Sequence, residues 1–108
     1  MPGDMVSQAI EAAHAIGHAH GGRRFAAAVG QFAETLASVP DYTPADVPSG
    51  TIPLLKTLAE DVIVQIERRI DAGRDRAVVQ RDLAESVYDV RRGLEEIDRW
   101  QRHYLGAG

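Results

Sequence analysis

The fold is decided by residues 75–105, which read DRAVVQRDLAESVYDVRRGLEEIDRWQRHYL. Mostly apolar side chains recur there at alternating spacings of four and three residues, and they are Leu83, Val87, Val90, Leu94, Ile97, Gln101 and Tyr104. This heptad spacing places them on one face of an α-helix, with the charged residues on the other face. The stretch therefore predicts one long helix over about residues 75–105.

The preceding segment predicts a helix that pairs with this one. Residues 52–72 carry an apolar stripe at helical spacing, made of Leu55, Ala59, Val62, Ile66 and Ile70. Gly73 is a typical residue for ending a helix, and only Gly73 and Arg74 separate the two helices. Because so short a turn reverses the chain, the two helices are expected to form an antiparallel hairpin.

The first forty residues predict two shorter helices. One is expected over about residues 5–20 and the other over about residues 23–38, each with apolar side chains three or four positions apart. Gly21 and Gly22 lie between them, and two adjacent glycines cost about 2 kcal/mol inside a helix. The sequence therefore favours a break, and a single kinked helix is the alternative.

Residues 40–51 form a proline-rich connection that cannot continue a helix. It contains three of the five prolines of the chain, and Pro53 follows it closely. Thr43 to Asp46 reads Thr-Pro-Ala-Asp, a pattern typical of one short helical turn. We expect a crossover rather than a binding loop here. The whole chain, residues 1–108, is predicted to be a single all-α domain, a small four-helix bundle with a long C-terminal helix.

Composition excludes several classes of function. The chain has 12 Lys and Arg against 16 Asp and Glu, a net charge of −4, and no cysteine. An acidic balance disfavours nucleic acid and anionic membranes as partners, and the lack of cysteine excludes disulfide scaffolds. The first residues lack the basic segment of a signal peptide, and no apolar run reaches about 18 residues. We expect a soluble, cytoplasmic protein.

A possible metal site involves Glu11, His14 and His18. Spacings of three and four residues place these side chains on one helix face, and two imidazoles at i and i+4 can reach one metal ion. Glu-x-x-His is also the pair that di-iron bundles use twice, so a second copy of the chain would have to complete such a site. The competing interpretation is that these are surface histidines near a helix C-terminus, where positive charge is favourable. We expect no cofactor and keep a transition metal as the alternative.

A small all-α enzyme or phosphotransfer module is a further alternative. Residues 14–21, HAIGHAHG, resemble the phosphoacceptor helix of histidine-phosphotransfer domains, which would imply an exposed histidine that accepts phosphate. The resemblance covers barely a tenth of the chain, and the lysine that typically follows the acceptor is missing, since the only lysine is Lys56. The acids of the C-terminal half do not reproduce the Mg²⁺-binding spacing of all-α nucleotide pyrophosphohydrolases. The sequence offers no catalytic candidate, and we expect no enzyme activity.

The different lengths of the last two helices predict an interface. At 1.5 Å per residue they extend about 31 and 45 Å, so the shorter one ends opposite about residue 96. The apolar seam continues beyond that point and needs cover from the first two helices, the proline connection or another chain. We expect a protein-interaction module that forms a homo-oligomer, with Trp100 as its hot spot. The expected interface residues are Leu94, Ile97, Trp100, Gln101 and Tyr104.

Overall fold

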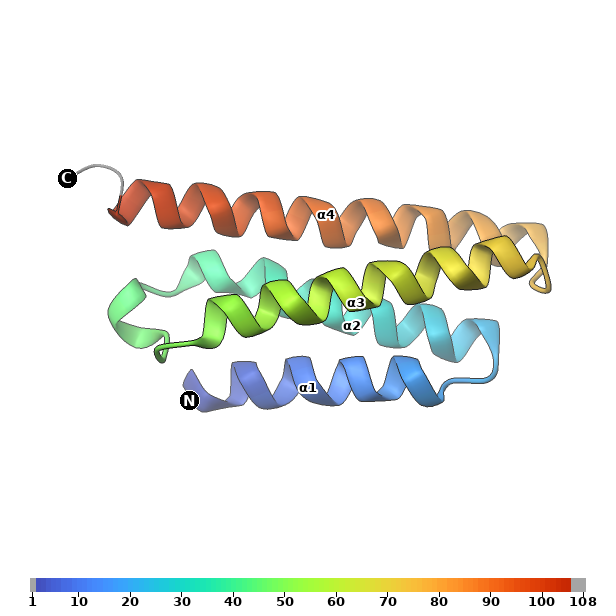
Figure 1. Cartoon of the computed structure of the whole chain (residues 1–108), viewed down its shortest axis with the longest axis horizontal. Helices are drawn as coiled ribbons and strands as arrows, with labels where there is room; N and C mark the ends of the chain where they lie inside the picture. The colour runs from blue at the N-terminus through green and yellow to red at the C-terminus, as the bar shows by residue number, and fades with distance from the viewer. Residues whose placement is uncertain (1, 106–108) are drawn as a thin grey trace.

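Four α-helices make up the computed structural model, which describes residues 2–105, and this part contains no strand (Figure 1). The prediction of an all-α four-helix bundle is confirmed. Two short 3₁₀ turns lie in the connection between the second and third helices. The elements are α1 (Pro2–His18), α2 (Gly22–Ser38), η1 (Val39–Asp41), η2 (Pro44–Asp46), α3 (Thr51–Ala72) and α4 (Ala77–Leu105).

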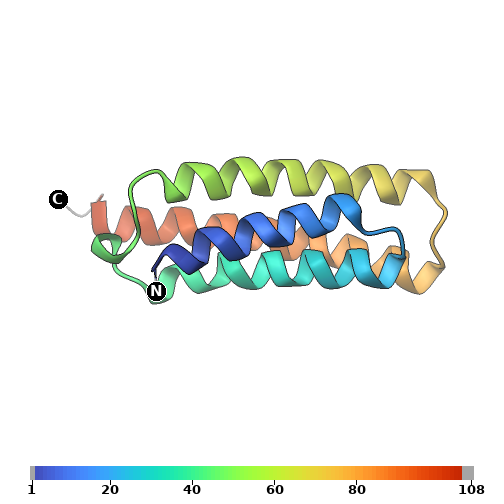
Figure 2. The same ribbon diagram turned by 90° about the horizontal axis from the view of Figure 1, so that it is seen from below.

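The helices pack as a square whose diagonals are α1 with α4 and α2 with α3 (Figures 1 and 2). The predicted antiparallel hairpin of α3 and α4 forms two of its corners. Because α2 is followed by its diagonal partner, the connection with η1 and η2 must cross one end of the bundle. Successive helices run in opposite directions, so the crossing brings the parallel helices α2 and α4, and likewise α1 and α3, side by side.

The core is formed by the apolar faces that the periodicities predict. Aromatic and branched side chains of α2, α3 and α4 fill most of it, whereas α1 contributes small residues besides Met5 and Ile16. Small side chains let helix backbones approach closely, and α1 makes a more extensive contact with α2 than with α3. The largest fully buried side chains are Phe32, Ile16, Leu36, Leu55, Ile66, Leu83, Ile97, Val29, Val39, Val62 and Val90.

Several helix boundaries differ from the expected ones. The break between α1 and α2 is confirmed, and Gly73 ends α3 with a positive φ of 64°. Helix α3 begins at Thr51, after Gly50 with φ 84°, one residue earlier than predicted. Helix α4 begins at Ala77 instead of about residue 75. Asp75 precedes it without capping it, because its carboxylate is held by Arg69 of α3.

Two glycines in helices give opposite expectations for stability. A Cβ at Gly93 of α4 would lie 2.9 Å from the Leu36 Cβ of α2, whereas a Cβ at Gly30 would meet nothing within 4 Å. We expect Gly30→Ala to stabilise the fold by about 1 kcal/mol through helix propensity. At Gly93→Ala the same gain is outweighed by overpacking of about 1–3 kcal/mol. Urea unfolding measures both, and equal stabilisation by the two variants would contradict the tight α2–α4 contact.

Candidate functional site

Part of the C-terminal end of α4 is covered by other segments of the same chain. Ile97 is fully buried, and Trp100 is only 8% exposed. The Trp100 Nε1–H donates a hydrogen bond of 2.8 Å to the backbone carbonyl of Tyr42, between η1 and η2. The sequence left this cover open between the first two helices, the proline-rich connection and another chain, and for Trp100 the proline-rich connection supplies part of it.

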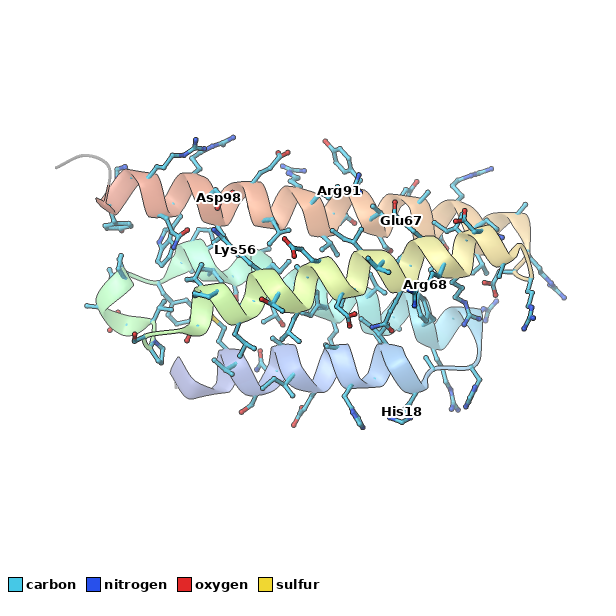
Figure 3. The ribbon with its side chains drawn as sticks, in the orientation of Figure 1. His18, Lys56, Glu67, Arg68, Arg91 and Asp98 are labelled. Atoms are coloured by element: carbon cyan, nitrogen blue, oxygen red, sulfur yellow. The ribbon has the colours of Figure 1, made fainter. Side chains whose placement is uncertain are left out.

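The other predicted interface residues lie in different surroundings. Leu94 and Gln101 are half-buried, and Tyr104 is 46% exposed. The Gln101 Oε1 accepts a hydrogen bond of 3.3 Å from the Lys56 Nζ, which also lies 2.7 Å from the Asp98 Oδ1. Figure 3 shows Lys56 on α3 and Asp98 on α4, so this ion pair links the two helices. Gln101 thus has a polar partner inside the chain, and Tyr104 is the most exposed of the predicted set.

An aromatic cluster surrounds Tyr104. Its ring lies 5.9 Å from the Trp100 ring and 5.0 Å from the His103 ring, both with edge-to-face geometry. Next to it runs a groove of about 390 Å³, which we call the tip groove. Its lining residues are Pro40, Glu96, Arg99, Trp100, His103 and Tyr104. The groove therefore combines an aromatic wall with charges of both signs.

The predicted metal-site residues all lie exposed on α1. The rings of His14 and His18 are close, with centroids 4.3 Å apart, as their spacing predicts. Glu11 instead lines a polar groove of about 750 Å³ between α1 and α2, together with Glu34. Within residues 2–105, no group of three or more His, Cys, Asp or Glu side chains is arranged to hold a metal ion. Metal binding by the histidine pair stays a prediction.

At the opposite end of the bundle, Arg69 of α3 joins the two short turns. Its guanidinium donates hydrogen bonds of 2.9 and 3.2 Å to the Asp75 carboxylate, beyond the α3–α4 turn. It donates a third, of 3.0 Å, to the carbonyl of His20 in the α1–α2 turn. The same guanidinium lies over the Phe25 ring, 4.8 Å from its centroid. Arg69 is thus a polar tie between segments that are distant in sequence.

Sequence reasoning missed this tie. From the sequence alone, Arg69 is one of several charges near the end of the predicted helix 52–72, and Asp75 is the first residue of the predicted helix 75–105. The available signal was a complementary pair six residues apart across the turn at Gly73. The His20 partner could not be recognised without knowing that the two turns lie side by side.

Other acids of the C-terminal half take part in exposed ion pairs. The Glu67 Oε2 lies 3.7 Å from the Arg91 Nη2, and the Glu96 Oε1 lies 3.4 Å from the Arg92 Nε. Figure 3 shows Glu67 on α3 and Arg91 on α4. For these two acids the interpretation as surface ion pairs is confirmed. Such pairs typically contribute about 0–1 kcal/mol, so they add little to the stability of the fold.

None of the helices in residues 2–105 is long and apolar enough to cross a membrane. Comparisons of the chain with protein-family models, with curated proteins and with solved structures give no match.

Proposed function

We propose that this chain is a non-catalytic, cytoplasmic protein-interaction module that forms a homo-oligomer through the C-terminal part of α4. The observation that carries the proposal is the tip groove, where Tyr104 is 46% exposed between Trp100 and His103. Tyrosine and tryptophan side chains are among the residues that most often dominate the binding energy of protein interfaces.

Charge order along α4 favours a second copy as the partner. Glu95, Glu96 and Asp98 precede Arg99 and Arg102, so acids occupy one turn of the helix and bases the next. A two-fold axis perpendicular to α4 near this point would make the α4 helices of two copies antiparallel. The acidic turn of each copy would then lie opposite the basic turn of the other. Complementary charges of this kind select the partner and fix the register.

The proposed interface is narrower than the sequence alone predicts. Tyr104 and the exposed edge of Trp100 would supply the contact, while buried Ile97 supports them from beneath. Leu94 and Gln101, both half-buried, would lie at its border. The interface is therefore centred one helical turn closer to the chain end than Trp100.

Tyr104→Ala is expected to weaken self-association without unfolding the chain. Truncation of a hot-spot aromatic typically costs about 2 kcal/mol, which raises the dissociation constant about thirtyfold. Because Tyr104 is half exposed, the free energy of unfolding should change by about 0.5 kcal/mol or less. Sedimentation equilibrium measures the association, and urea unfolding measures the stability.

Tyr88→Ala is the matched control. Tyr88 is also a tyrosine of α4, 66% exposed, and it lies outside the tip groove. Its truncation should leave the dissociation constant unchanged. A wild type that stays monomeric at high micromolar concentration would reject self-association, and an equal loss in both variants would move the interface away from the tip.

A further inference from the structure

Positive charge is concentrated at the end of the bundle where the two short turns lie. The turn end, defined as residues 19–24 and 68–81, contains seven arginines and two aspartates, a net charge of +5. Since the whole chain carries −4, the remaining residues carry −9. Figures 1 and 2 show both turns together at the end of the bundle opposite the C-terminal end of α4. One end of the bundle is therefore strongly basic although the chain as a whole is acidic.

A groove of about 680 Å³ opens between the two turns. It is lined by Ala19, His20, Gly21, Gly22, Arg68, Arg69, Ala72, Arg74 and Asp75. Its base is held in place by the Arg69–Asp75 pair, and the turns approach so closely that a Cβ at Gly22 would lie 2.8 Å from the Asp75 Oδ1. The groove is thus a fixed feature of the fold rather than a gap between mobile loops.

Two arginines of this groove are available to a ligand. Arg68 and Arg74 are exposed, and neither forms an ion pair or hydrogen bond with the described residues. Figure 3 shows Arg68 on α3 toward the same end of the bundle as His18. The only acid lining the groove, Asp75, is already neutralised by Arg69. The groove therefore presents two guanidinium groups with no internal anion to satisfy them.

We propose that this groove binds a compact phosphate-bearing ligand with a diphosphate or a similar group that has two neighbouring anionic centres. The guanidinium fork matches phosphate oxygens in a bidentate way, and Arg68, Arg69 and Arg74 line the groove. The volume falls within the range of small-molecule sites, about 300–1,000 Å³. A long polyanion would extend over the remaining surface, which carries −9 and would repel it.

Titration of the ¹⁵N-labelled chain with pyrophosphate at constant ionic strength tests the proposal. We expect backbone amide shifts confined to the two turns, in residues 19–24 and 68–76, and saturable with one site. Inorganic phosphate, with a single phosphoryl group, should bind more weakly at the same residues. No saturable shift at millimolar pyrophosphate would overturn the proposal.

Arg68→Gln and Arg74→Gln should each weaken pyrophosphate binding about tenfold, since hydrogen bonds to charged groups contribute about 1.5–3 kcal/mol. Arg91→Gln is the matched control, because it removes the same charge from α4 outside the groove, where Arg91 forms only an exposed pair with Glu67. An equal loss in all three variants would overturn the proposal, because it would reveal a long-range charge effect without a site.

Two further ligands distinguish a site for a compact diphosphate from a site for a longer polyanion. Tighter binding of a short polyglutamate peptide, or of a single-stranded oligonucleotide, than of pyrophosphate would overturn the assignment to a compact ligand. Oligomeric state in the Arg68→Gln variant should equal that of the wild type, because the groove and the tip groove lie at opposite ends. Failure of the pyrophosphate site and failure of the proposed self-association can therefore be distinguished.

Discussion

Trp100→Ala is expected to lower the free energy of unfolding by about 3–5 kcal/mol, as large-to-small changes of buried aromatic residues do. The side chain is 92% buried where α4 meets the η1–η2 crossover, and its loss would leave both a cavity and an unpaired Tyr42 carbonyl. Urea unfolding followed by circular dichroism measures the effect. The sequence alone predicts a different role, because it makes Trp100 the hot spot of a homo-oligomer interface.

Trp100→Phe separates the two parts of this loss. Phenylalanine keeps much of the buried apolar area but cannot donate to the Tyr42 carbonyl, so about 1–3 kcal/mol should be lost, less than in the alanine variant. Both variants should also loosen the crossover, which is visible as faster amide exchange in residues 39–47. A Trp100→Ala chain with wild-type stability and weakened self-association would show that Trp100 faces a partner instead of the crossover.

Most of the fold could be predicted from apolar spacing and from glycine and proline positions. The seam from Leu83 to Ile97 is long enough to identify a helix, and Gly73 marks the hairpin turn correctly. The path of the proline-rich connection could not be predicted. Whether α3 lies beside α2 or diagonally across from it depends on how the apolar faces of all four helices pack together. No local sequence pattern predicts which arrangement forms. The cover over Trp100 follows from that choice.

The candidate sites divide in the same way. The contact between His14 and His18 follows from their spacing of four residues on one helix, and the structure confirms that their rings lie close. The groove at the turn end depends on two turns that are about fifty residues apart in the chain, so spacing gives no sign of it. Net charge was misleading in that case, because the chain's total net charge of −4 includes one end of the bundle with a net charge of +5.

Arg69→Met is expected to lower the free energy of unfolding by about 2–3 kcal/mol, below the 3–5 kcal/mol of a fully buried pair because some solvent reaches these side chains. Arg69 and Asp75 are only 22% and 12% exposed, so the variant leaves a largely buried carboxylate without its partner. It also removes the hydrogen bond to the His20 carbonyl and the contact with the Phe25 ring. Thermal or urea unfolding measures the loss.

The neighbouring residue provides a matched control for this last effect. Arg68→Met removes the same charge from the same turn of α3, but Arg68 is exposed and has no ion-pair partner among the described residues, so stability should change by about 0.5 kcal/mol or less. A double-mutant cycle with Asp75→Asn isolates the pair, and we expect a coupling energy of about 1–2 kcal/mol. Additive effects, or equal losses at the two arginines, would mean that the two turns are held together by apolar packing alone and that Arg69 is an ordinary surface charge.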